Sequence, residues 1–196
     1  MFWSGVNVRV KGCEHISRKG PQILMANHQS NYDVLALLGY IPVRFTWTAK
    51  KELFRIPFLG FAMRRAKYIE VDRQSHARAM ASMERAARQI REGTSVMIFP
   101  EGTRSTDGSL LPFKKGGIML ALKAGVPIIP IGISGSREIL PRDSLRLTPG
   151  TIRMVIGPPI DPCNYTIEKR DELLECVRDA IADCIEKARL DETFKK

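Results

Sequence analysis

The sequence predicts an α/β protein with a mixed, largely parallel central sheet flanked by helices. Short apolar runs alternate with helical patterns along the chain, which is typical of this class. One run, from Pro127 to Ile133, is almost entirely apolar, as expected of a strand covered on both faces. Of the 196 residues, 44% are hydrophobic and 27% are charged, an ordinary composition for a folded domain. We therefore expect a single domain over residues 1–196.

The predicted strands are short runs of apolar or alternating residues. Val6 to Val10 alternates with a period of two, which indicates an edge or half-buried strand. Ile23 to Ala26 follows Gly20-Pro21 and has the pattern of a buried strand. The other strands are predicted over residues 45–48, 68–71, 95–99, 127–133 and 151–156.

The predicted helices show apolar residues at helical spacing. The first three are followed by Gly39, Gly93 and Gly125, and glycine is the residue that most often ends a helix. The fourth has an apolar stripe formed by Leu173, Leu174, Val177, Ile181, Cys184, Ile185 and Ala188. The four helices are predicted over residues 30–38, 75–91, 115–124 and 167–189.

The chain is basic, with a net charge of +10. Such a surface attracts nucleic acid, acidic lipid or phosphorylated metabolites, and charge alone does not choose among them. Basic residues occur only in pairs such as Lys50-Lys51, and no nucleic-acid motif is present, so we expect no nucleic-acid partner. His15, His28 and His76 lack partners at metal-ligand spacing, so no metal site is expected. The four cysteines form no Cys-x-x-Cys pair and are predicted to be reduced thiols.

No membrane-spanning helix is predicted. A span needs roughly 18 apolar residues, and the best stretch, residues 118–133, is interrupted by Lys123 and Pro127. Arg9 and Lys11 interrupt any apolar core of a signal peptide. We therefore expect a cytoplasmic protein whose contact with a membrane is peripheral.

The pair His28 and Asp33 follows a buried strand directly, where α/β proteins often place chemistry. The two side chains can meet only if the chain turns between them. Asp33 could then orient the imidazole as a general base. Alternatively, Ser30-x-x-Asp33 is a capping-box pattern, which needs no chemistry.

A second candidate loop is Phe99-Pro100-Glu101-Gly102-Thr103-Arg104, at the end of another apolar strand. Gly102 permits a backbone shape closed to other residues, and the guanidinium of Arg104 suits phosphate oxygens. Lys114 and Lys115 follow a short turn, so the loop could cradle a phosphate. Alternatively, the loop is a tight turn in which Glu101 pairs with Arg104.

Four blocks in this order resemble those of the glycerolipid acyltransferases, in particular the 1-acylglycerol-3-phosphate (lysophosphatidate) acyltransferases. The blocks cover residues 27–33, 68–73, 99–104 and 126–131. The resemblance implies a glycerol-3-phosphate acyltransferase-like fold and a role in phospholipid biosynthesis.

The resemblance also implies roles for individual residues. His28 would be the general base, and Asp33 would orient it. The phosphate and glycerol of the acceptor would be bound by Lys50, Arg73, Glu101, Gly102, Thr103 and Arg104. The block 126–131 would line the core and the acyl side.

The implied reaction is direct acyl transfer. The donor would be acyl-CoA or acyl carrier protein, the acceptor a lysophospholipid, and no cofactor would be required. Related acceptors stay open: glycerol-3-phosphate, lyso-ornithine lipid or another lysophospholipid. Another class of function, a non-catalytic basic module that binds lipid or nucleic acid, is the remaining alternative.

Members of the resembled family commonly have a hydrophobic helix before the first block, whereas only 26 residues precede Asn27 here. We expect the segment from Leu53 to Arg65 to substitute for this helix, because Phe54, Phe58 and Phe61 recur at helical spacing with basic residues beside them. We expect it to dock on the inner face of an anionic membrane. Alternatively, the aromatic rings belong to the core. Pro57 and Gly60 also weaken the prediction of a regular helix here.

Overall fold

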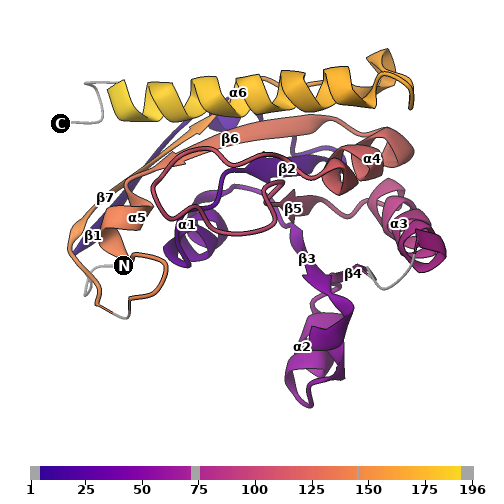
Figure 1. Ribbon diagram of the computed structural model, residues 1–196, viewed down its shortest axis with the longest axis horizontal. Coiled ribbons are helices and arrows are strands. Elements are labelled where there is room, and N and C mark those ends of the chain that lie inside the picture. The colour runs from indigo at the N-terminus through magenta and orange to yellow at the C-terminus, as the bar shows by residue number, and fades with distance from the viewer. Residues whose placement is uncertain (1–4, 72–75, 145, 191–196) are drawn as a thin grey trace.

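The computed structural model describes residues 5–71, 76–144 and 146–190. In these residues, one sheet of seven strands runs through the molecule in the order β1-β7-β6-β2-β5-β3-β4 (Figure 1). Neighbouring strands are parallel, except that β6 and β7 are antiparallel. The predicted mixed, largely parallel sheet is therefore confirmed. The strands are β1 Val6–Lys11, β2 Ile23–Ala26, β3 Thr46–Lys50, β4 Ile69–Val71, β5 Val96–Ile98, β6 Ile128–Ser134 and β7 Gly150–Ile156.

The helices lie on both faces of the sheet. The predicted boundaries agree with the observed ones to within a few residues, and the last apolar stripe is buried as predicted. The α-helices are α1 Tyr32–Tyr40, α2 Leu59–Arg65, α3 His76–Arg91, α4 Lys115–Ala124, α5 Ser136–Ile139 and α6 Arg170–Leu190. Short 3-10 helices are η2 Cys13–His15, η3 Lys51–Arg55 and η4 Pro162–Asn164.

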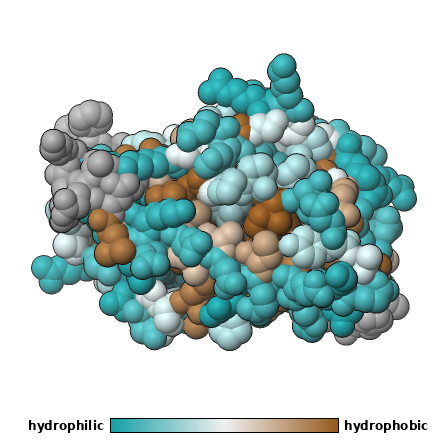
Figure 2. Space-filling model, turned by 90° about the horizontal axis from the view of Figure 1, so that it is seen from above, coloured by the Kyte–Doolittle hydropathy of each residue, from teal (hydrophilic) through white to brown (hydrophobic). Residues whose placement is uncertain are grey.

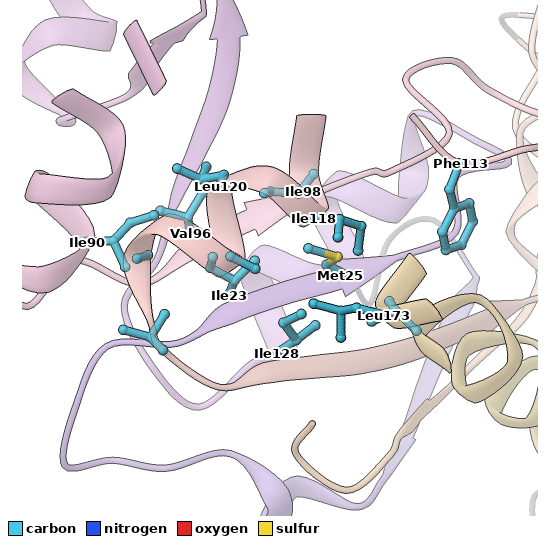
Figure 3. Close-up of a cluster of buried hydrophobic side chains, with 14 of the residues drawn as sticks. Ile23, Met25, Ile90, Val96, Ile98, Phe113, Ile118, Leu120, Ile128 and Leu173 are labelled. Atoms are coloured by element: carbon cyan, nitrogen blue, oxygen red, sulfur yellow. The ribbon is translucent and has the colours of Figure 1, made fainter. Parts of the chain in front are cut away.

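The core has two halves, because successive side chains of a strand point to opposite faces of the sheet. Ile23 and Met25 of β2 pack with residues of α3, α4 and α6 on one face (Figure 3). Leu24 and Ala26 pack with residues of α1 on the other face. All four side chains of β2 are buried, so this strand is held firmly in the centre of the sheet. The loop that follows β2 therefore starts from a rigid support.

The strands β2, β5, β3 and β4 are parallel neighbours, so their carboxyl ends lie at one edge of the sheet. At this edge, η3 and α2 leave the end of β3 and project away from the body of the protein (Figure 1). The opposite side differs: the face that carries α6 is mostly hydrophilic (Figure 2). Within the described ranges, no helix is both long and apolar enough to cross a lipid bilayer.

Candidate active site

His28 and Asp33 meet across the turn that joins β2 to α1. The Nδ1 atom of His28 lies 2.9 Å from Oδ2 of Asp33, and the His28 side chain is 15% exposed whereas that of Asp33 is fully buried. With the proton on Nδ1, the imidazole donates to the carboxylate, and Nε2 is left as an acceptor. The pair has the arrangement that orients a histidine as a general base.

Asp33 also caps the turn. Its Oδ2 accepts hydrogen bonds from the backbone N–H groups of Gln29 and Ser30, each at 2.8 Å. The Ser30 hydroxyl oxygen accepts from the N–H of Tyr32, at the start of α1. The capping pattern and the paired imidazole are therefore not alternatives, because one carboxylate oxygen serves both.

The start of the turn is fixed to the neighbouring strand β6. The side-chain amide of Asn27 donates to the carbonyl of Ile133 at 3.0 Å and accepts from the N–H of Ile133 at 2.7 Å. Both hydrogen bonds are buried, and hydrogen bonds are stronger in the protein interior than in water. Asn27 thus sets the direction in which His28 leaves the sheet.

The loop after β5 lies directly against this turn. Glu101 accepts the backbone N–H of His28 at 2.7 Å through Oε1 and the N–H of Leu111 at 2.9 Å through Oε2. Ser105 donates its N–H to the carbonyl of His28 at 2.8 Å. Burial raises the pKa of the Glu101 carboxyl above its ordinary value, while the bonds from Leu111 and His28 act in the opposite direction. The Glu101 side chain therefore ties block 99–104 to the backbone of block 27–33 at His28.

Phe99 sets the plane of the imidazole. The rings of Phe99 and His28 are stacked, with centroids 3.9 Å apart and an angle of 8° between the planes. Trp47 of β3 packs against Phe99, with the two ring centroids 5.4 Å apart. Asp33 and Phe99 together restrict both the rotation and the tilt of the His28 ring.

Arg104 is not paired with Glu101, so the tight-turn ion pair considered from the sequence is absent. Instead, Nη1 of Arg104 donates to the carbonyl of Arg142 at 2.7 Å, and Nη1 of Arg142 donates to the carbonyl of Arg104 at 3.0 Å. Nη1 of Arg137 donates to the carbonyl of Thr106. Three arginines therefore surround the loop that follows Glu101, and the sequence had pointed only to the first.

Gly102 and Lys114 are close neighbours. Gly102 has a φ of +71°, and a Cβ built there would lie 2.9 Å from Nζ of Lys114. Any larger residue at 102 would thus be strained and would displace the ammonium group. In the sequence, Lys114 is distinguished only as one of two adjacent lysines. Its neighbour Lys115 forms an ion pair of 2.8 Å with Asp171 of α6.

An apolar cavity of about 410 Å³ opens beside Phe99. It lies between α3, α4 and the end of β5, and Gly102 and Lys114 are part of its wall. Its apolar wall includes Ala79, Met83, Ala86, Ile98, Gly117 and Leu120. No residue of the block 126–131 lines this cavity, although Val126, Ile128, Ile129 and Ile131 are buried in the core. The cavity could not be foreseen from spacing, because its wall is formed by β3, β5, α3, α4 and the loop after β5, which are far apart in the sequence.

The remaining predicted residues are less completely described. Thr103 lies in the exposed part of the loop after β5. Lys50 ends β3 beside Val71 of β4, but its side chain lies outside the described residues. Arg73 lies wholly outside them. Among the side chains that are described, no three histidines, cysteines or acids gather as metal ligands would.

A family model described as Acyltransferase matches residues 7–134. This chain belongs to the acyltransferase family. Its relatives include a 1-acyl-sn-glycerol-3-phosphate acyltransferase of Limnanthes douglasii, 36% identical over 176 residues, which are 89% of this chain and 62% of that protein. The alpha form of that enzyme in Homo sapiens is 34% identical over 175 residues, with the same two coverages.

The fold is also similar to a solved acyltransferase. The crystal structure of the 1-acyl-sn-glycerophosphate (LPA) acyltransferase PlsC from Thermotoga maritima matches with a TM-score of 0.83 and 32% identity. The match covers 96% of this chain and 75% of that one. The chain spans about 62% of the length of the two curated relatives.

Proposed function

We propose that this protein is an O-acyltransferase that moves a fatty acyl group from a thioester donor to the free hydroxyl of a lysophosphatidate-like acceptor. The observation that carries the proposal is the buried Asp33 carboxylate holding His28 beside a basic loop and an apolar cavity. The donor is acyl-CoA or acyl carrier protein. The product would be a diacylated phospholipid precursor, as expected of an enzyme of phospholipid biosynthesis.

His28 performs the proton transfers. Its Nε2 takes the proton of the acceptor hydroxyl as the oxygen attacks the thioester carbonyl, and a C–O bond forms. The tetrahedral intermediate then collapses, the C–S bond breaks, and the thiolate leaves with the proton that His28 had taken. Asp33 stabilises the protonated imidazole between the two steps. The substrate hydroxyl is itself the nucleophile, so no acyl-enzyme forms.

The apolar cavity suits the acyl chain of the donor. Its wall includes Phe99, whose ring stacks on His28, so a chain inside the cavity would leave its thioester near the imidazole. The interior wall of Met83, Ile98 and Leu120 offers only apolar contacts, as a hydrocarbon chain requires.

The acceptor phosphate is bound by the basic loop. Arg104 keeps guanidinium N–H groups beyond the one that it donates to Arg142, and Lys114 holds its ammonium group over Gly102. Lys50 and Arg73 are proposed for the same phosphate on the strength of the family resemblance. Glu101 fixes the loop that carries Arg104 to the backbone of His28 and Leu111, so a phosphate bound there would hold the acceptor beside the imidazole.

The reaction would take place on the inner face of a membrane. The lysophosphatidate acceptor is a lipid, whereas both proposed donors are water-soluble molecules of the cytoplasm. A peripheral protein with a net charge of +10 would be attracted to an anionic leaflet.

The test is an acyl-transfer assay with purified protein. Lysophosphatidate, glycerol-3-phosphate, lyso-ornithine lipid and lysophosphatidylcholine are each incubated with acyl-CoA and acyl carrier protein thioesters, and products are identified by mass. We expect transfer to lysophosphatidate, and a His28→Ala variant that is slower by about 10³-fold with its fold intact by circular dichroism. The matched control is His15→Ala, at the far edge of the sheet. A His28→Ala variant that kept most of the turnover would contradict the mechanism, and transfer to another acceptor alone would replace the substrate.

A further inference from the structure

Exposed hydrophobic side chains gather on one projecting part of the protein. Five of the twelve large hydrophobic residues that are exposed in the described chain lie between residues 53 and 61. Phe58 is 90% exposed and Phe61 is 65% exposed. The other three are Leu53, Ile56 and Leu59. We call residues 53–61 the apolar tip.

The apolar tip is built as a fixed structure. Phe54 is buried and anchors it, which corrects the expectation that Phe54 shares an exposed face with Phe58 and Phe61. A Cβ on residue 60 would overlap the carbonyl oxygen of Phe54, so glycine at this position allows the backbone of α2 to contact the backbone of η3. The same carbonyl accepts a hydrogen bond of 2.9 Å from Nη1 of Arg64.

Phe58 stands at the apex with strained backbone geometry. Its φ is +62°, in a region that bulky residues other than glycine rarely adopt. Such a conformation persists only where the surrounding structure imposes it. Here the strained backbone turns the Phe58 ring outward, and this ring is the most exposed aromatic side chain among the described residues.

Cations surround the apolar tip. Residues 51–67 hold five basic residues and one acid, Glu52. Arg55, Arg65 and Lys67 are exposed. An apolar group edged by arginine and lysine matches the boundary between the acyl chains and the headgroups of an anionic leaflet.

The apolar tip and the candidate active site leave the same edge of the sheet. The tip follows β3, and His28 follows β2, which is parallel to β3 through β5. Trp47 of β3 also packs on Phe99, the ring that stacks on His28. Contact between the tip and a bilayer would therefore turn the edge that carries the imidazole toward the lipid.

We propose that residues 53–61 insert into the headgroup region of an anionic membrane, with Phe58 and Phe61 as the deepest side chains. This inference rests on the proposed function, because a lipid acceptor requires the site to face a bilayer. It adds which residues enter the lipid and which way the protein is oriented on it.

The test is co-sedimentation of the full chain with vesicles of phosphatidylcholine containing increasing fractions of phosphatidylglycerol. We expect binding to rise with the anionic fraction and to fall with salt. The double variant Phe58→Ser and Phe61→Ser should reduce the bound fraction by about tenfold or more. The control is Ile167→Ser, an apolar residue before α6 that is 51% exposed, and this variant should bind as the parent protein does.

A second variant separates charge from insertion. Arg55→Glu with Arg65→Glu should abolish the dependence on the anionic fraction, whereas Arg88→Glu, on the exposed side of α3, should change it little. Binding by the double serine variant equal to that of the parent protein would overturn the proposal. A change of the serine variant from dimer to monomer on size-exclusion chromatography would overturn it too, because the tip would then contact a second copy.

Vesicle binding by the apolar tip can be measured separately from acyl transfer at His28. His28→Ala should bind vesicles like the parent protein, and the serine variant should keep its activity on a short-chain acceptor dissolved as monomers. If the serine variant loses vesicle binding but the parent protein transfers an acyl group to no acceptor, the membrane proposal stands and the proposed reaction is wrong. If the parent protein transfers the acyl group but the serine variant binds vesicles equally well, the reaction stands and the membrane proposal is wrong.

Discussion

Two segments at one edge of the sheet reverse the usual placement of polar and apolar groups. The turn after β2 buries polar side chains, namely Asn27, Gln29, Ser30 and Asp33. The segment after β3 exposes apolar ones, with Phe58 at its apex. The polar side chains of the first are held by hydrogen bonds inside the protein, whereas the exposed Phe58 and Phe61 rings of the second face the solvent.

The difference separates two tasks: the buried turn positions the His28 imidazole, and the exposed segment is available for contact with a lipid surface. A buried carboxylate is destabilising unless it is hydrogen-bonded. Asp33 accepts three bonds through one oxygen, while its Oδ1 finds no partner among the residues that the structure describes. That cost is the price of an imidazole held in one orientation. The apolar tip needs no such precision, because a lipid surface accepts any apolar side chain that reaches it.

The largest effect is expected where the buried turn is broken. Asp33→Asn keeps the size of the side chain but sets an amide against the backbone donors and favours the wrong imidazole tautomer. We expect kcat to fall by about 10²-fold or more, with little change in the KM of the donor. Steady-state kinetics measures both constants, and Asp179→Asn on the exposed side of α6 is the control. Unchanged kcat would show that Asp33 only caps α1.

A smaller effect, on acceptor binding alone, is expected in the loop after β5. Arg104→Ala removes a guanidinium from the proposed phosphate site, so the KM of the acceptor should rise by about 10- to 100-fold. The KM of the donor should stay within about twofold, and Arg88→Ala should alter neither. Equal changes in both constants would place Arg104 outside the acceptor site.

The smallest effect distinguishes two adjacent lysines. Lys114→Ala removes the ammonium group over Gly102, and we expect the acceptor KM to rise by about fivefold. Lys115→Ala breaks only an ion pair with Asp171 that is exposed and screened by solvent, so kinetics should be unchanged. Thermal unfolding of both variants checks that stability does not explain the difference. Equal KM values for the two variants would remove Lys114 from the site.

Local pattern predicted most of the fold. The strand Ile23–Ala26 and the helix Lys115–Ala124 have the predicted bounds, because a short apolar run and a glycine after a helix are strong local signals. The sequence left a helix in the region of Leu59–Arg65 open, because the aromatic residues have helical spacing while Pro57 and Gly60 are unfavourable to helices. The structure resolves this conflict by starting the helix after Pro57 and packing Gly60 against Phe54.

The sequence by itself determined the class of fold, the order of its elements and the residue types of the site, since these depend on periodicity and on short motifs. Only the tertiary structure decided that Asp33 serves the turn and the imidazole together, that Glu101 binds backbone N–H groups, and that Phe54 is buried while Phe58 is exposed. The physical reason is that each of these depends on contacts between segments far apart in the chain. Spacing along a sequence carries no record of which distant group completes a hydrogen bond or covers a ring.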